Sequence, residues 1–261
     1  MILIPMCVAL IAGAVYLITS SSSDDSNRLG SGVMFDGIAR VYDSANMMMS
    51  LGLHHMWKDV LVSKMDIQPG DKVLDLATGT GDIAIKLADA MMTEHPSVKR
   101  EGQASISPFT MTGSVLGLDP SKKMLEIAKN KVMDKRLTGW ITLMHGDAES
   151  LDDLPDHTYD KVTISFGIRN FGNSVKALDE ARRVLKEDNP GGRVGILEFV
   201  SPTEGPIAAA ASLFLEYCIP AIGAIMSLGK VNEYKHLRDS IKEFPSPAEF
   251  AGMMSTAGFR D

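Results

Sequence analysis

Cysteine is scarce in this sequence, and acidic residues outnumber basic ones. The 261 residues include only Cys7 and Cys218 as cysteines, which excludes a disulfide framework and a zinc site with four cysteine ligands. A net charge of −7 argues against duplex nucleic acid as a partner, because phosphate neutralisation requires a basic surface. No metal site is expected either, since metal-binding spacing is absent among His54, His55, His145 and His157.

The composition excludes disordered and collagen-like chains. Apolar residues make up 45% and charged residues 23% of the chain, as in folded domains. An α/β domain of about 200–250 residues commonly forms one unit. The sequence therefore predicts a single domain with appendages.

The first 18 residues carry no charged side chain. A helix of this length covers about 27 Å, close to the hydrocarbon thickness of a bilayer. No Lys or Arg precedes Arg28, which is atypical of a cleavable signal or a transit peptide. A retained membrane anchor, a removed signal-like segment and a mis-set chain start all stay open. We divide the chain into an apolar segment (1–19), a polar linker (20–32) and a folded domain (33–261).

Strands and helices alternate strictly in the folded part, after a leader at 35–65 with helical spacing. This pattern predicts an α/β fold with a parallel sheet, helices on both faces and a ligand crevice at the carboxyl ends of the strands. Residues 93–112 lack periodicity and contain two prolines, so we expect an inserted surface loop. Strands are predicted at 72–76, 114–119, 140–144, 159–166 and 193–199, and helices at 83–91, 121–132 and 177–185.

A glycine pair, Gly79 and Gly81, follows the first predicted strand and precedes a helix. Glycine at these positions lets an adenosine-bearing ligand approach the backbone. The spacing is similar to a dinucleotide fingerprint, with Ala84 in place of the third glycine, and a P-loop is excluded.

Carboxylates follow successive strands at Asp75, Asp119 and Asp147. A carboxylate after the second strand can accept both ribose hydroxyls, and Asp147 stands where an adenine amino group can be accepted. A positively charged sulfonium cofactor fits this acidic rim better than a pyrophosphate does.

The folded part also contains several longer motifs: VLDLATGTGD (73–82), LGLDPSKKML (116–125), GDAE (146–149), ISFGIRN (164–170), the 183–199 run and the 35–58 leader. Together these motifs resemble the UbiE-type C-methyltransferases of ubiquinone and menaquinone biosynthesis, from about residue 33 to 259. The mitochondrial, ubiquinone-making branch carries an insertion near the position of 93–112, which favours that branch. The sequence lacks the terminal strand hairpin that the resemblance implies after residue 259.

The resemblance implies a class I S-adenosylmethionine-dependent methyltransferase with a Rossmann-like sheet and an N-terminal helical lid. The implied reaction is C-methylation of a polyprenyl benzoquinol ring. The implied catalytic residues are Arg169, Asn170 and Tyr42, and the implied substrate-binding residues are these three with Asn46. The implied cofactor-binding residues are Asp75, Gly79, Thr80, Gly81, Asp82, Asp119, Pro120, Asp147, Ala148 and Ser165.

Each proposed catalytic side chain also has a structural alternative. A guanidinium is a poor base, so Arg169 is expected to stabilise a quinolate anion with Asn170 as its hydrogen-bond partner, or else to tie a loop to the sheet. Tyr42 is expected to orient the ring or carry a proton, or to be a core tyrosine. Lys58 is interpreted as a surface lysine and Glu198 as a brace, and His145 is a weaker candidate for a proton acceptor.

Residues 206–228 form an apolar run that contains Glu216 and Pro220. Both residues are costly inside a bilayer, so we expect two short helices that line a prenyl-tail groove or form a dimer face. Met47, Met48 and Met49 are expected to line the same mouth or to pack in the core.

Two other functions stay open at this point. One is C-methylation of demethylmenaquinone or a plastid quinone, and the other is a non-catalytic membrane scaffold in a quinone-biosynthesis complex. The expected partners are a lipophilic quinol, a membrane surface or anchor, a second copy of the chain and other quinone-pathway enzymes, but no nucleic acid. The expected location is the mitochondrial inner membrane, with a plastid or another membrane as the alternative.

Overall fold

The computed structural model describes the folded part of the chain with several gaps. Within those residues, no helix combines the length and apolarity that a membrane crossing requires. The expected N-terminal segment, residues 95–112 of the expected insertion and nearly all of 206–228 lie outside the described residues. The described residues are 32–50, 52–94, 113–187, 192–200, 216–217, 236 and 239–260.

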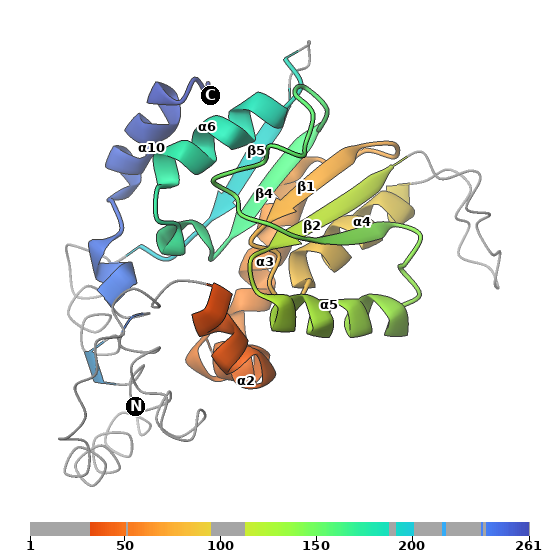
Figure 1. Cartoon of the computed structure of the whole chain (residues 1–261), viewed down its shortest axis with the longest axis horizontal. Helices are drawn as coiled ribbons and strands as arrows, with labels where there is room; N and C mark the ends of the chain where they lie inside the picture. Colours follow the sequence, from red (N-terminus) through yellow and green to blue (C-terminus); the bar gives the residue numbers. More distant parts are fainter. Residues whose placement is uncertain are drawn as a thin grey trace, which may run out of the picture.

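A parallel sheet forms the centre of the described structure (Figure 1). Its order is β3-β2-β1-β4-β5, so the chain turns from one side of β1 to the other between β3 and β4. This is the doubly wound arrangement predicted from the alternating pattern, with the switch point between β1 and β4. The strands are β1 (Lys72–Leu76), β2 (Ser114–Asp119), β3 (Ile141–His145), β4 (Lys161–Ser165) and β5 (Arg193–Leu197).

Two hydrophobic clusters cover the two faces of the sheet. One contains residues of α3 and α4 against β1 and β2, and the other contains α6 with side chains of α10 packed against it. Figure 1 shows α10 beside α6. The helices are α2 (Gly32–Ser50), α3 (Leu53–Met65), α4 (Asp82–Glu94), α5 (Lys122–Asp134), α6 (Ser174–Val184) and α10 (Pro247–Thr256), with a short 3-10 turn η4 (Ile168–Asn170).

The leader folds as two helices, with Gly52 between them at a φ of 81°. Gly32, which was assigned to the linker, is instead the first residue of α2. A Cβ on Gly32 would lie 2.4 Å from the Pro120 carbonyl oxygen, so only glycine permits α2 to begin this close to the end of β2. Likewise, the predicted loop 93–112 loses its first two residues to α4.

Helix α2 is held on the N-terminus of α5 by one carboxylate. Asp36 Oδ1 accepts hydrogen bonds from Ser121 Oγ at 2.6 Å and from the Lys123 amide at 2.9 Å. Ile38 and Ala39 of α2 pack against Met124 of α5 in a small apolar cluster. The leader therefore lies over the carboxyl end of β2, where the lid was expected.

The end of α2 is joined to α3 through a buried histidine. His54 Nδ1 lies 2.6 Å from Ser50 Oγ, and that hydroxyl donates to the Asn46 carbonyl oxygen at 2.7 Å. Burial lowers the pKa of His54 to about 4, and the neighbouring His55 and Lys58 act in the same direction. His54 is therefore neutral in the folded protein near pH 7.

This neutral histidine predicts a loss of stability in mild acid. Between pH 6.5 and pH 4, His54 is protonated in the unfolded chain but stays neutral in the folded protein. Because the unfolded state binds the additional proton, the free energy of unfolding falls as the pH falls. We expect His54 to account for about 1–2 kcal/mol between pH 7 and pH 5. Urea unfolding of the wild type and His54→Gln at both pH values measures this term. An equal loss in both proteins would contradict it.

Candidate functional site

The glycine loop after β1 is docked on the end of β2. The Thr78 amide donates to the Leu118 carbonyl oxygen at 3.0 Å, and the Gly79 amide donates to Asp119 Oδ2 at 2.8 Å. Gly81 has a φ of 83°, and a Cβ there would lie 3.0 Å from the Cβ of Ala128 on α5. The second glycine of the pair is thus required both by its backbone conformation and by the close approach of α5.

Asp119 holds two chain segments at once. Its Oδ2 accepts from Gly79, and its Oδ1 accepts from the Ser121 amide at 2.8 Å. Burial raises the pKa of Asp119, and the two amide hydrogen bonds oppose this effect. Each carboxylate oxygen keeps a further lone pair with which it can accept a hydrogen bond from a ligand.

A cavity of about 330 Å³ opens between the glycine loop, α2 and the carboxyl ends of β2 and β4. This volume is in the range of small-molecule and cofactor sites, which combine apolar walls with a few polar groups. Phe35, Phe166 and Phe171 contribute aromatic rings to it. The other lining residues are Gly32, Tyr42, Ala77, Gly79, Leu118, Asp119, Pro120, Met124, Asp147, Ala148, Glu149, Ser165, Gly167, Asn170 and Gly172.

Two buried polar atoms in this cavity point to a ligand. The Ser165 hydroxyl oxygen and the Asn170 amide nitrogen are buried, and neither has a hydrogen-bond partner among the described residues. A buried polar atom without a partner costs about 1–3 kcal/mol. A bound molecule with complementary polar atoms would remove this cost.

The structure brings most of the proposed site residues to this one cavity. They come from α2, the glycine loop, the end of β2, the loop after β3, and β4 with η4. The aromatic wall was missed by the sequence analysis, although Phe35 and Phe166 lie within the quoted motifs. The proposed residues that line the cavity are Tyr42, Gly79, Asp119, Pro120, Asp147, Ala148, Ser165 and Asn170.

Asp75 lies beneath the loop and is not among the residues that line the cavity. Its two oxygens accept from Thr78 Oγ1 at 2.6 Å and from Thr163 Oγ1 at 2.7 Å. Burial raises the pKa of Asp75 to about 6. These hydrogen bonds let the carboxylate support the loop, and the cofactor contact expected of Asp75 from the sequence stays a prediction.

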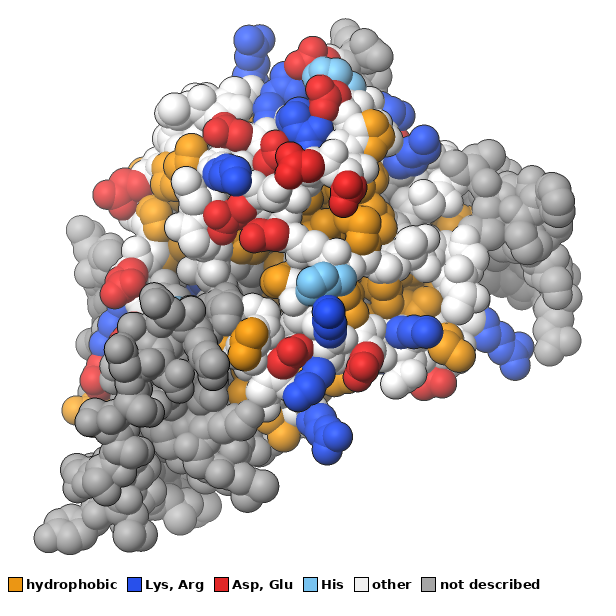
Figure 2. Space-filling model, viewed as in Figure 1, with side chains coloured by type: hydrophobic (Ala, Val, Ile, Leu, Met, Phe, Trp, Pro, Cys, Tyr) orange, Lys and Arg blue, Asp and Glu red, His pale blue; other side chains and the backbone are white. Residues whose placement is uncertain are grey.

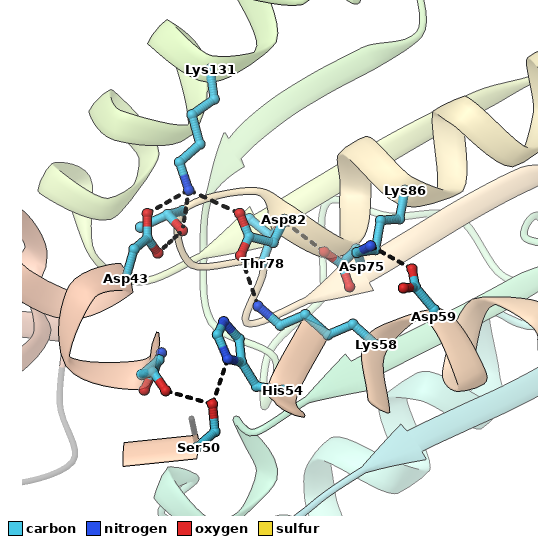
Figure 3. Close-up of polar contacts among 12 residues, drawn as sticks. Asp43, Ser50, His54, Lys58, Asp59, Asp75, Thr78, Asp82, Lys86 and Lys131 are labelled. Atoms are coloured by element: carbon cyan, nitrogen blue, oxygen red, sulfur yellow. Dashed lines mark hydrogen bonds and ion pairs between the residues drawn. The ribbon is translucent and has the colours of Figure 1, made fainter. Parts of the chain in front are cut away.

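Thr80 and Asp82 are not among the residues that line the cavity either, and both contact Lys131. Figure 3 shows Asp82 between Lys131 and Lys58. Lys131 Nζ donates to Thr80 and to Asp82, at 2.9 Å in each case. Lys58 Nζ lies 2.8 Å from Asp82 Oδ2, and the Lys58 side chain is only 10% exposed. The interpretation of Lys58 as a plain surface lysine is therefore wrong. Its partner comes from α4, which helical spacing within the leader does not reveal.

Arg169 forms a buried ion pair with Glu198 at the end of β5. Their side chains are 6% and 4% exposed, and the guanidinium lies 5.8 Å from the centre of the Phe199 ring. The pair ties η4 to the sheet, as the structural alternative for Arg169 and the brace interpretation of Glu198 expected. Arg169 is not among the residues that line the cavity of Asn170, and it lines a second cavity of about 240 Å³.

Tyr42 and Asn46 lie one turn apart on α2. Burial raises the pKa of Tyr42, while the positive charge of Arg169 opposes this effect. The phenol is thus protonated at neutral pH and can donate a hydrogen bond. Tyr42 faces the cavity of Asn170 and still lies within the electrostatic influence of Arg169.

His145, the weaker candidate for a proton acceptor, points elsewhere. Its Nε2 lies 3.1 Å from the Pro120 carbonyl oxygen, and the side chain is exposed rather than part of the cavity wall. The face of the molecule drawn in Figure 2 carries both signs of charge. Figure 2 shows acidic and basic side chains interspersed on this face of the described structure, with apolar side chains between them.

Comparison with known proteins relates this geometry to a family. Residues 23–261 match the model of the ubiE/COQ5 methyltransferase family. The chain is 37% identical over 244 residues to the mitochondrial 2-methoxy-6-polyprenyl-1,4-benzoquinol methylase of Rattus norvegicus. The alignment covers 87% of this chain and 72% of that protein. It is also 37% identical over 228 residues to the ubiquinone/menaquinone biosynthesis C-methyltransferase UbiE of Citrifermentans bemidjiense, with 87% of each chain covered.

The fold has solved counterparts as well. A SAM-dependent methyltransferase from Aquifex aeolicus superimposes with a TM-score of 0.50 at 18% identity, covering 78% of this chain and 79% of the other. At this identity the likeness shows the shared α/β fold alone. It agrees with the class I methyltransferase architecture that the resemblance implied.

The buried ion pair at η4 leads to a prediction about stability. Glu198→Gln leaves the Arg169 charge buried without a counter-ion, so we expect the free energy of unfolding to fall by roughly 2–4 kcal/mol. Glu187→Gln is the matched control, because Glu187 pairs with Arg182 at 3.1 Å on the surface, and about 0.5 kcal/mol or less is expected there. Chemical denaturation measures both. Equal effects of the two substitutions would contradict the assignment of a buried pair.

Proposed function

Because the chain belongs to the ubiE/COQ5 methyltransferase family, we propose that it transfers a methyl group from S-adenosylmethionine to a ring carbon of a polyprenyl benzoquinol in ubiquinone biosynthesis. The observation that carries the proposal is the cavity at the sheet's switch point. It combines a glycine loop, a carboxylate that accepts a hydrogen bond from a loop amide, and two buried polar atoms that have no hydrogen-bond partner in the described part of the chain.

The residues of the cavity fit S-adenosylmethionine. When bound, this cofactor supplies an activated methyl group on a positively charged sulfur. Asp119 has acceptor capacity for ribose hydroxyls, and Asp147 has it for an adenine amino group. Ser165 Oγ, which has no partner in the described part of the chain, offers one further polar contact. The rings of Phe35 and Phe171 provide flat apolar surface for a base.

Tyr42 and Asn170 are the side chains that we assign to the quinol. Both line the cavity, and Tyr42 comes from the lid helix while Asn170 comes from the opposite wall. The protonated phenol of Tyr42 can donate to a ring oxygen, and the Asn170 amide can donate to another. This pair of donors would orient the ring and would hold negative charge that develops on its oxygens.

Arg169 does not line the cavity, and we assign it an electrostatic effect on the same negative charge of the quinol oxygens. Its guanidinium cannot serve as a base at neutral pH, and its position is set by Glu198 and Phe199. We assign it the stabilisation of quinolate charge through its field, which already acts on Tyr42. The partial neutralisation by Glu198 means that both members of the pair must be varied to test this role.

A naphthoquinol is the second candidate acceptor. The chain is 37% identical to a bacterial UbiE that is named for both ubiquinone and menaquinone biosynthesis. This identity equals the one to the mitochondrial relative, so it supports a naphthoquinol as an acceptor. A methyl-transfer assay on reduced benzoquinols and naphthoquinols, with products identified by mass spectrometry, decides between them. Methylation of neither quinol, together with no binding of S-adenosylmethionine by calorimetry, would leave the scaffold hypothesis standing.

We also propose that the protein works at a membrane of the mitochondrion. The relatives from Rattus norvegicus and Homo sapiens are named as mitochondrial proteins, and a polyprenyl substrate resides in a bilayer. The uncharged residues 1–18 support membrane attachment from the sequence side. The narrower assignments to the inner membrane, to a homodimer and to a quinone-biosynthesis complex remain hypotheses.

Removing the carboxylate of Asp119 should weaken cofactor binding. We expect Asp119→Ala to reduce the affinity for S-adenosylmethionine by about 1–3 kcal/mol, because the hydroxyl partners and the Gly79 amide lose their acceptor. Isothermal titration calorimetry measures the change. Asp153→Ala, an exposed aspartate outside the cavity wall, is the control and should bind as the wild type does. Unchanged affinity of Asp119→Ala would refute its assignment.

The role of Arg169 can be separated from its ion pair with a double variant. Arg169→Gln alone removes the field and also leaves Glu198 unpaired, whereas Arg169→Gln with Glu198→Gln removes both charges. We expect the double variant to fold and bind cofactor, with kcat lowered by about 10²–10³-fold. Wild-type turnover by the double variant would show that Arg169 is a structural tie only.

A further inference from the structure

We propose that Lys131 is a positioning residue that locks the lid helix α2 onto the glycine loop and thereby keeps Tyr42 at the cavity. The inference rests on the proposed function only where it concerns cofactor affinity. The lock itself is a property of the folded chain. It therefore has a readout that needs neither cofactor nor substrate.

The ammonium of Lys131 contacts three parts of the fold at once (Figure 3). It donates to Asp43 Oδ2 on α2 at 2.5 Å, to Thr80 Oγ1 in the glycine loop at 2.9 Å and to Asp82 Oδ1 at the start of α4 at 2.9 Å. An ammonium group has three N–H donors. All of them are satisfied by acceptors on segments other than α5, which carries Lys131.

The acceptors around Lys131 depend on one another. Thr80 Oγ1 donates to Asp43 Oδ1 at 2.7 Å, so the lid aspartate binds both the lysine and the loop. Asp82 is shared with Lys58 of α3 at 2.8 Å. Two carboxylates and two ammonium groups thus balance in charge. Without Lys131, Asp43 and Asp82 would face each other with Lys58 bound to only one of them.

The pKa shifts of Asp82 and Lys131 both favour the charged forms of these two side chains in the folded protein. Burial alone would raise the pKa of Asp82, but Lys58 and Lys131 hold it well below its usual range. Burial alone would lower the pKa of Lys131, but Asp43 and Asp82 raise it. The side chains of Lys131 and Asp43 are 29% and 43% exposed, so water and salt reach this contact and it can open without unfolding of the core.

The position of Asp43 explains why the lock matters for the cavity. Tyr42 precedes Asp43 on α2 and lines the cavity, as do Gly32 and Phe35 at the start of that helix. That start is already fixed by Asp36 on the N-terminus of α5. Lys131, nearer the other end of α5, supplies the second attachment. Helix α5 and its N-cap therefore hold the lid at Asp36 and at Asp43. Through Lys131, α5 also holds the glycine loop at Thr80.

The first test is hydrogen exchange of the ligand-free full chain, measured by mass spectrometry. We expect Lys131→Met to speed exchange of amides in α2 by about tenfold, with β1 and α6 unchanged. Lys129→Met is the matched control, because Lys129 is an exposed lysine on the same helix. Lys131→Arg keeps a cation at this position and should restore part of the protection of α2.

The second test is calorimetry with S-adenosylmethionine. We expect Lys131→Met and Asp43→Asn each to raise the Kd by about 5–20-fold, and the double variant to add little to either change. Unchanged α2 exchange in Lys131→Met overturns the proposal. A loss of protection spread equally over α2, β1 and α6 also overturns it, since Lys131 would then support the whole fold. Failure of the wild type to bind S-adenosylmethionine would count against the proposed function, and the exchange experiment would still decide about the lock.

Discussion

The carboxylate of Asp119 is the group on which the arrangement of the cavity depends. One of its oxygens holds the Gly79 amide and the other holds the Ser121 amide, so the glycine loop and the start of α5 are fixed to the end of the same strand. Ser121 in turn donates to Asp36 of α2. The lid, the loop and α5 are therefore linked in one chain of hydrogen bonds that begins at the carboxyl end of β2.

Three aspartates near the glycine loop differ in role because their surroundings differ. Asp75 is buried among threonine hydroxyls, and burial raises its pKa to about 6. Asp82 lies between two lysines, which keep it ionised despite its burial. Asp119 binds two amides and still faces the cavity. The same type of side chain thus supports the loop, belongs to an ion network or faces the cavity, according to the groups around it.

Much of the fold follows from the sequence, because buried parallel strands have continuous apolar runs. The strands at 72–76 and 114–119 were predicted with the bounds that the structure has. The predicted strand 159–166 was too long, since Tyr159 forms only an isolated bridge to Leu185 and Phe166 has a φ of 56°. The side chains that meet across the fold were not predictable. Lys58 and Asp82, and Arg169 and Glu198, are 24 and 29 residues apart, and only packing brings them together.

The turn η4 shows why substitutions in this site need paired variants. Asn170 faces the cofactor-sized cavity, whereas the adjacent Arg169 lines a separate cavity with His236 and Glu243. Both side chains are fixed by the same short turn, and the backbone amide of Arg169 also donates to Glu198. Loss of the Arg169 charge would therefore leave the Glu198 carboxylate without its ion-pair partner beside the turn that carries Asn170. A single variant at this turn can therefore lower turnover in two ways, by removing the Arg169 charge and by leaving an unpaired charge beside Asn170, and the double variant removes the second of these.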